Sequence, residues 1–476
     1  MRRIILPLLF IPVLFSCSPS VRQGEKMPVN ESKYWKMVNV SGDDTLTLKD
    51  QDAALISRFK VKNFTLSMNI YTTDQAEASL MIHTGKESGA ADKGYTVAIN
   101  NSVYRSGSAQ KTGSLSHIRN NYIHLVDDNT WFNLTVDVRG SRIAVLINDK
   151  IISEYNEPEN PFRIEGHEGM KLSDGYIRFE KKTGNGTVFI GDMTLEALPD
   201  DLTESDTNSI DEANDYLTFL NQQDFPVIDF HGHLKGGLTV EQVSAHGRLH
   251  GYNYGLAPNC GLNFPVTNDS SLRAWYNEME PEPVFKAMQC EGREWVTLFS
   301  PDAIALYDYI FTDAMTWTDH KGRRMRLWIP EETFVDNEQQ FMDMLVGKIE
   351  AVMNQEPVDI YVNPTYLPDV IAAKYNELWT PERMDRVIKA LADNDVALEI
   401  NSRFKIPSLE FIKRARQAGV KFTLGTNNGG NEDLGALEYS LQMIREAGIT
   451  ADEMYLPKPA GEKKVLSKGL PAKITG

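Results

Sequence analysis

The pattern of apolar and polar positions divides the chain into two parts. From about residue 34 to residue 198, apolar and polar residues alternate in short runs separated by Gly, Asn and Asp. This alternation is typical of strands with one buried face. The runs are residues 64–70, 95–99, 132–138, 142–147, 176–179 and 187–198. We therefore predict an antiparallel sandwich of two sheets, with Asn148, Asp149 and Lys150 forming a hairpin turn.

From about residue 225, apolar strand-like runs alternate with helical patterns. The predicted strands are residues 227–230, 295–299, 309–312, 359–362, 396–400 and 421–424, and the predicted helices are residues 341–354, 380–394, 408–418 and 434–447. Repeated strand–helix units predict an α/β barrel or a doubly wound sheet, whose active site lies at the carboxyl ends of the strands. The polar, acidic segment 199–224 is interpreted as a linker.

Composition and charge narrow the classes of partner. The chain is 41% apolar and 24% charged, as in globular proteins, and its formal net charge is −17. Because Lys and Arg form no local cluster, a polyanion would be repelled, which excludes a nucleic-acid partner. A small or neutral substrate, or a bound cation, suits this charge better.

The N-terminus has the pattern of an export signal. Arg2 and Arg3 precede an apolar run over residues 4–15, and Cys17 follows. We expect a secretory leader with cleavage before Cys17, whose acylated thiol anchors the protein to a membrane. The alternative is an ordinary signal peptide with a chance Cys. Because no acidic cluster follows Cys17, a periplasm-facing anchor is favoured over surface display. Cys260 and Cys290 form either one disulfide or two buried thiols.

The strongest local motif for chemistry is a pair of histidines. His231 and His233 follow an apolar strand at positions i and i+2, so both imidazoles face one direction. Imidazole is a preferred ligand of Zn, Fe, Mn and Ni, so the pair predicts a metal site. The alternative is a pair of polar loop histidines.

Further polar residues stand in or after the predicted strands. Glu399 lies inside an apolar strand, where burial is costly unless the carboxylate is paired or bound to a cation. Arg403 offers the alternative of a structural salt bridge. Asp313, Asn363 and Asn427 follow other strands and are candidates for ligands, bases or substrate contacts, or for caps and loops.

The predicted sandwich carries aromatic residues suited to sugars. Tyr95 and Trp131 are candidates for a sugar-binding face, because aromatic rings stack on pyranose rings. Core packing is the alternative for both side chains.

The second half, about residues 225–457, resembles the PHP (polymerase and histidinol phosphatase) superfamily of metal-dependent hydrolases. The resemblance rests on Asp229-Phe-His231-Gly-His233 and on the strand ending in Glu399-Ile-Asn401. It implies a distorted TIM-like barrel with metals at the carboxyl ends of the strands. Where family members carry Ser-Asp-x-His, this chain has Thr426-Asn-Asn-Gly, and Asp313 and Asn363 replace later histidines.

These departures imply a reduced site rather than a three-metal phosphoesterase site. A single divalent ion (Zn, Mn, Fe, Ni or Mg) is expected, and its expected ligands are His231, His233, Glu399 and Asp313. The expected catalytic residues are Asp313, Glu399 and Arg403, and the expected substrate contacts are Asn363, Asn401, Asn427, Tyr95 and Trp131.

The first half resembles the concanavalin-like family of 3-keto-disaccharide hydrolases, a jelly-roll sandwich. The matching stretches are residues 93–99, 111–115, 131–136, 142–149, 175–179 and 189–195. Together the two resemblances imply an exported lipoprotein with a metal-dependent hydrolase or lyase that acts on a glycoside or 3-keto-glycoside. Two alternatives stay open: a glycan-binding lipoprotein with an inactive barrel, and a PHP-type phosphoesterase.

Overall fold

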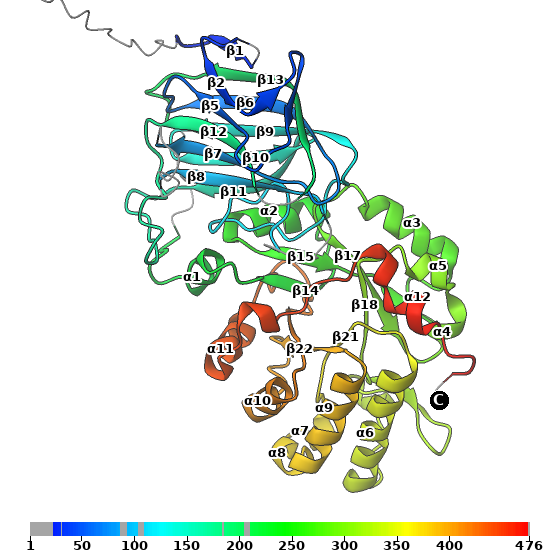
Figure 1. The fold of residues 1–476 in the computed structure, drawn as a ribbon. Helices are drawn as coiled ribbons and strands as arrows, with labels where there is room; N and C mark the ends of the chain where they lie inside the picture. The colour runs from blue at the N-terminus through cyan, green and yellow to red at the C-terminus, as the bar shows by residue number, and fades with distance from the viewer. Residues whose placement is uncertain are drawn as a thin grey trace, which may run out of the picture.

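A computed structural model describes residues 22–29, 31–85, 93–102, 109–182, 185–203 and 210–474. These residues form an N-terminal β-sandwich and a C-terminal α/β barrel that pack against each other (Figure 1). Cys17, the predicted acylation site, lies outside the described residues. Within the described ranges, no helix has the length and apolar character needed to cross a membrane.

The sandwich consists of two antiparallel sheets, as predicted. One sheet has the order β11-β10-β9-β6-β13-β4-β3, with β1 added beside β13, and the other has the order β2-β5-β12-β7-β8. Alternate side chains of both sheets fill the core between them, which explains the period-two pattern. Asn148 and Asp149 have φ values of 48° and 65° in the predicted hairpin turn.

The strands of the first sheet are β1 (Lys26–Pro28), β3 (Val40–Ser41), β4 (Thr45–Leu48), β6 (Phe64–Thr72), β9 (Trp131–Arg139), β10 (Arg142–Ile147), β11 (Lys150–Asn156) and β13 (Val188–Ala197). The strands of the second sheet are β2 (Trp35–Val38), β5 (Ala54–Ser57), β7 (Glu77–Thr84), β8 (Tyr95–Asn100) and β12 (Tyr176–Lys181).

The second domain is a closed barrel of parallel strands, which decides between the two predicted α/β architectures. Its order is β15-β14-β23-β22-β21-β18-β17, and pairing of β15 with β17 closes the ring. The strands are β14 (Ile228–Gly232), β15 (Asn253–Leu256), β17 (Phe285–Glu291), β18 (Tyr309–Thr312), β21 (Ile360–Tyr361), β22 (Ala397–Asn401) and β23 (Phe422–Gly425). The short strand β16 (Asn259–Gly261) adds to β17, and β19 (Thr316–Thr318) pairs with β20 (Arg324–Arg326).

Helices surround the barrel (Figure 1). They are α1 (Tyr216–Gln222), α2 (Val240–His250), α3 (Asp269–Met279), α4 (Trp295–Leu298), α5 (Pro301–Ile304), α6 (Glu338–Gln355), α7 (Asp369–Ala372), α8 (Tyr375–Leu378), α9 (Pro381–Asp393), α10 (Leu409–Gln417), α11 (Glu438–Ala447) and α12 (Lys464–Lys468). Short 3-10 turns cover Pro330–Glu332, Ala451–Glu453 and Ala460–Glu462. The four predicted helices are confirmed as α6, α9, α10 and α11.

Five of the six predicted barrel strands are present, and the sixth prediction is wrong. Residues 295–299 contain the helical turn α4, in which the indole N–H of Trp295 donates to Glu356 at 2.8 Å. A short apolar run cannot be assigned to strand or helix by periodicity alone. The true strand, β17, comes before this segment and was missed because Lys286, Gln289 and Glu291 interrupt its apolar pattern.

The second half of the predicted linker belongs to the folded domains. Residues 216–222 form α1, which Asp215 caps, and Leu217 and Leu220 pack in the barrel core. Glu212 accepts a hydrogen bond from Tyr155 of the sandwich at 2.7 Å and pairs with Arg163 at 3.1 Å. This segment therefore ties the two domains together.

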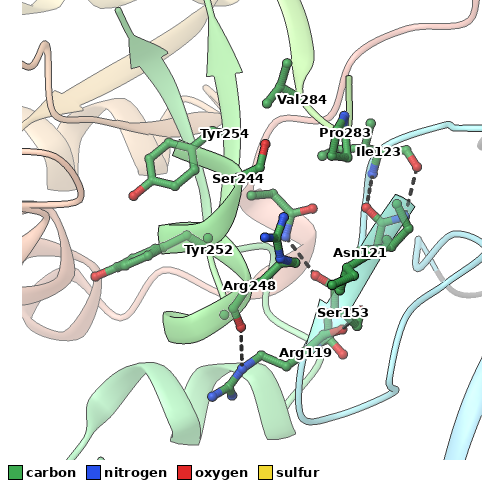
Figure 2. Close-up of a pocket in the computed structure, with 16 residues that line it drawn as sticks. Arg119, Asn121, Ile123, Ser153, Ser244, Arg248, Tyr252, Tyr254, Pro283 and Val284 are labelled. Atoms are coloured by element: carbon green, nitrogen blue, oxygen red, sulfur yellow. Dashed lines mark hydrogen bonds between the residues drawn. The ribbon is translucent and has the colours of Figure 1, made fainter. Parts of the chain in front are cut away.

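A loop of the sandwich closes the amino-terminal end of the barrel. Tyr122 and Ile123 pack among the apolar residues of the barrel interior. The Tyr122 hydroxyl donates to Asp224 at 2.9 Å, and Arg119 donates to the carbonyls of Arg248 and Leu249 at 3.0 and 2.8 Å. Figure 2 shows this interface, where a cavity of about 30 Å³ is left between the domains. That space suits a water or two rather than a substrate.

Candidate functional site at the carboxyl end of the barrel

A pocket of about 550 Å³ lies at the carboxyl ends of the barrel strands, which is where barrels of this kind hold their active sites. Its polar lining residues come from seven strands or the loops after them. They are Lys235, Asn259, Gln289, Glu291, Asp313, Asn363, Arg403 and Asn427. The apolar and aromatic lining residues are Phe264, Pro265, Met315, Trp328, Tyr366 and Phe404. The volume is that of a typical small-molecule site.

The two predicted metal-binding histidines are buried at the end of β14, with ring centroids 5.2 Å apart. Nδ1 of His233 lies 2.9 Å from the carbonyl oxygen of Ala257, which can only accept, so this nitrogen carries the proton. Nδ1 of His231 lies 2.6 Å from Oε1 of Glu399 and donates to the carboxylate in the same way. The lone pair of each ring therefore sits on Nε2, and neither Nε2 has a hydrogen-bond partner in the described residues.

Burial keeps His233 neutral, because it lowers the pKa of this imidazole well below its usual value. A neutral imidazole with a free lone pair is the form that binds a metal ion. The pattern also fits the common arrangement in which a metal-binding histidine gives its other N–H to a carboxylate or a carbonyl. The two Nε2 atoms are therefore suited to a divalent ion.

Glu399 plays a different role from the predicted one. Its Oε1 accepts from His231, and its Oε2 accepts from the Asn363 amide at 2.6 Å and from Nδ2 of Asn401 at 3.1 Å. The carboxylate is buried and committed to these groups, so it orients His231 instead of facing an ion. A Cβ at Gly425 would lie 2.0 Å from Oε1 of Glu399, so only glycine leaves room for the carboxylate here.

The predicted set of four metal ligands is not assembled. Across the described ranges, no group of three or more His, Cys, Asp or Glu side chains is arranged to hold a metal ion. Glu399 is turned to His231, and the carboxylate of Asp313 accepts from the Met315 amide at 2.9 Å and from Nδ2 of Asn363 at 3.0 Å. The donors that fit an ion are the two imidazoles, one fewer than the three protein ligands usual at catalytic zinc.

A pair of buried carboxyl groups lies in the pocket. Burial and the nearby charge of Asp313 raise the pKa of Glu291 to about 8. Burial also raises the pKa of Asp313, while hydrogen bonds from Met315 and Asn363 oppose that rise. One Oε atom of Glu291 accepts from Asn259 at 2.7 Å, and the other has no partner in the described chain. One proton shared by such a pair supplies both an acid and a base near neutral pH.

Glu291 is not among the residues predicted from the sequence, because the strand that carries it was not recognised. The signal in the sequence was an acidic residue, Glu291, at the end of the run that begins at Phe285 and directly before Gly292. Lys235, two residues after His233, was also missed. Its side chain makes no hydrogen bond or ion pair to another described residue, and burial with the charge of Arg403 lowers its pKa.

The other predicted barrel residues fall in two places. Asn363, Asn427 and Arg403 line the pocket, and Nη1 of Arg403 donates to the carbonyl of Asn427 at 2.8 Å. Asn401 is buried behind the pocket, where it links Glu399 to Asn363. Arg403 does not pair with Glu399, so the alternative of a salt bridge between them is wrong.

The two sandwich candidates differ in exposure. Tyr95 is 1% exposed and donates to Glu157 while accepting from Arg163, so the prediction that it binds sugar is wrong. Trp131 is 49% exposed on β9 and packs beside Tyr71, with ring centroids 5.5 Å apart. Its ring is available for stacking.

The remaining thiols are free. Cys260 and Cys290 are buried and occupy paired positions on β16 and β17. Burial raises the pKa of each thiol, as expected for unreactive side chains.

Comparison with known proteins agrees with the resemblance seen in the first half. Residues 26–195 match the family described as the 3-keto-alpha-glucoside-1,2-lyase-like domain. No curated protein matches the chain.

Each of the similar solved structures covers less than half of this chain. Histidinol phosphate phosphatase from Lactococcus lactis, complexed with zinc, L-histidinol and phosphate, is 13% identical; the match covers 47% of this chain and 95% of that chain with a TM-score of 0.35. The carbohydrate-binding module CBM66 from Bacillus subtilis is 17% identical; the match covers 34% and 95% with a TM-score of 0.25. Beta-glucanase from Bacillus licheniformis is 9% identical; the match covers 38% of this chain and 100% of that chain with a TM-score of 0.25. Folds of these kinds host many activities, so function is argued from the site.

Proposed function

We propose that the protein is an exported, membrane-anchored hydrolase or lyase that acts on a carbohydrate derivative, a glycoside or 3-keto-glycoside, in the barrel pocket. The observation that carries the proposal is the pair of buried carboxyl groups, Glu291 and Asp313, in a pocket at the carboxyl ends of the strands. The sugar substrate is suggested by the 3-keto-alpha-glucoside-1,2-lyase-like match of the sandwich.

The pair has the properties that elimination from a 3-keto-glycoside needs. Asp313, whose carboxylate receives hydrogen bonds from Met315 and Asn363, removes the proton from carbon 2 beside the ketone. Glu291, protonated up to about pH 8, gives its proton to the glycosidic oxygen as the bond from carbon 1 breaks. The products are an unsaturated keto-sugar and the free alcohol, and water added to the double bond completes a hydrolysis.

His231 and His233 are the residues that would hold a divalent ion, through their Nε2 atoms. Such an ion supplies polarisation of a carbonyl or activation of water when bound. Glu399 keeps the His231 ring in the orientation and tautomer that this binding requires.

Turnover of 3-keto-glycosides by the purified protein tests the proposal. Wild type is compared with Glu291→Gln and Asp313→Asn, which keep side-chain size, and with Glu410→Gln on the exposed surface of α10 as the control. We expect each pocket variant to lose about a hundredfold or more in kcat, as is typical when an acid or base is removed. Equal turnover in all variants would show that the reaction occurs elsewhere, for example on the sandwich.

A second candidate is a glycan-binding lipoprotein whose barrel is inactive. Two observations favour it: the described metal donors number two instead of three, and Trp131 offers an exposed ring on the sandwich. Glycan binding that is lost in Trp131→Ala, together with no turnover of any keto-glycoside after loading with divalent metals, would support this candidate.

A further inference from the structure

We infer that the substrate of the barrel pocket carries a carboxylate, as uronic and aldonic sugars do, and that Lys235 and Arg403 bind this group. The inference rests on the proposed function and adds a substrate class to it.

The two cations lie in one pocket without a carboxylate partner. Lys235 makes no hydrogen bond or ion pair to any described residue, and Arg403 bonds through Nη1 to the Asn427 carbonyl. The segments that carry them meet: a Cβ at Gly236 would lie 3.4 Å from Gly430, and one at Gly429 would lie 3.3 Å from Nη1 of Arg403. In a chain of net charge −17, two such cations side by side indicate an anionic ligand.

The charge around Lys235 and Arg403 suits a ligand with a single negative charge. The acids whose charges act on Lys235 are Glu291 and Asp433, and Oδ2 of Asp433 would lie 3.6 Å from a Cβ at Gly429. The Asp433 carboxylate is held by the backbone amides of Gly429 and Gly430. Because the pKa of Glu291 is raised to about 8, this acid is uncharged at neutral pH. Lys235, Arg403 and Asp433 then leave one net positive charge, which matches a carboxylate better than a phosphate dianion. The planar guanidinium of Arg403 also suits a carboxylate.

The rest of the pocket suits a sugar ring attached to that carboxylate. Tyr366 and Phe404 form an edge-to-face pair with ring centroids 4.9 Å apart, and the Trp328 side chain is 38% exposed nearby. The amides Asn259, Gln289 and Asn363 offer donors and acceptors for hydroxyl groups. The ligand would thus have its carboxylate at Lys235 and Arg403 and its ring beside Glu291 and Asp313.

Binding measurements on the full chain test this inference without any need for turnover. Isothermal titration calorimetry is performed with D-glucuronate, D-glucose and D-glucose 6-phosphate. The variants are Lys235→Met, Arg403→Gln and the double variant, which keep much of the side-chain volume. The matched control is Lys49→Met with Arg273→Gln, which removes two exposed charges outside the pocket. Circular dichroism checks that each variant is folded.

We expect glucuronate to bind about tenfold or more tightly than glucose, and the double variant to lose this preference while the control keeps it. Three results would overturn the inference: no glucuronate binding, a glucuronate preference that survives in the double variant, or tighter binding of the phosphate. Failure of the proposed function looks different, because glucuronate would then bind selectively while no keto-glycoside or glycoside is turned over. If instead the protein turns over neutral keto-glycosides and shows no preference for a carboxylate, the proposed function holds and the inference fails.

Discussion

Nδ1 of His231 lies 2.6 Å from Oε1 of Glu399, and both side chains are fully buried. This contact places the proton on Nδ1 and leaves the lone pair on Nε2. The bond also uses an acidic residue that would otherwise be a candidate metal ligand. The carboxylate thus determines which ligand atom the histidine can offer.

Replacing Glu399 tests this relationship. In Glu399→Gln, the amide can face His231 with either its oxygen or its NH₂ group, so the tautomer is no longer fixed. We expect affinity for Zn²⁺ or Co²⁺ to fall by about ten- to a hundredfold, as is typical when such a carboxylate is changed. Titration calorimetry measures the affinity, and the ¹⁵N shifts of His231 report the tautomer. An unchanged metal affinity in Glu399→Gln would contradict this role. A loss of affinity in the Glu410→Gln control as large as that in His231→Ala would contradict it as well.

Gly425 allows the Glu399 carboxylate to approach β23. A Cβ at position 425 would lie 2.0 Å from Oε1 of Glu399 and 3.0 Å from the Cβ of His231. Gly425→Ala should therefore destabilise the protein by about 2 kcal/mol or more, since overpacking a buried site forces neighbours to move. Gly461→Ala is the control, because no heavy atom lies within 4 Å of its Cβ. Thermal unfolding of both variants measures the difference, and equal midpoints would refute the steric argument.

The pKa of Glu291 predicts a pH dependence of activity. Since the proposed acid is protonated up to about pH 8, kcat should fall as pH rises through that value. A pH profile with a keto-glycoside substrate measures this fall. An activity that rises through pH 8 would exclude Glu291 as the acid.

The same shift predicts a pH dependence of stability. The pKa of Glu291 is raised from 4.5 to about 8 in the folded protein, so the folded state holds a proton that the unfolded state releases in this window. Stability should therefore fall as pH rises from about 4.5 to about 8. Glu291→Gln cannot ionise, so its unfolding free energy should fall less over this window. Parallel curves for wild type and variant would show that the carboxyl is not buried as described.

Tyr122 should contribute to the stability of both domains. Tyr122→Ala removes a fully buried ring from the barrel interior and the bond to Asp224, so we expect a loss of about 3–5 kcal/mol. Tyr122→Phe keeps the ring and loses only the hydroxyl, which should cost about 1 kcal/mol. Scanning calorimetry separates the two cases. Similar losses in both variants would mean that the hydrogen bond, not packing, holds the loop.

The sequence predicts the two architectures well, because each has a clear period. Strands β6 and β9 alternate strictly between buried and less buried residues, and β13 does so on either side of an irregularity at Gly191. Helices α9 and α10 present apolar stripes. It fails at β17, whose seven residues are all buried although three of them are polar or charged. Such a strand has neither period, and two of its three polar residues, Gln289 and Glu291, line the pocket.

Part of the candidate site could be predicted from the sequence, because several of its residues follow recognisable strands. His231, His233, Asp313 and Asn363 follow apolar strands and could be recognised from position. The direction in which Glu399 points depends on Gly425, Asn363 and Asn401, which are distant in sequence. The burial of Tyr95 and the exposure of Trp131 follow from the alternation itself, because Tyr95 is in phase with the apolar residues of β8 and Trp131 is in phase with the polar residues of β9.

The sandwich loop at residues 119–123, which closes the amino-terminal end of the barrel, has a practical consequence for protein production. The part of this loop that fills the base of the barrel lies between β8 and β9, in the middle of the sandwich, and not near the predicted linker at residues 199–224. Cutting the gene in that linker would leave Ile228, Phe230 and Tyr309 facing water at the open base of a truncated barrel. Expression trials, crystallisation and domain-swapping designs should therefore treat the sandwich and the barrel as a single inseparable part.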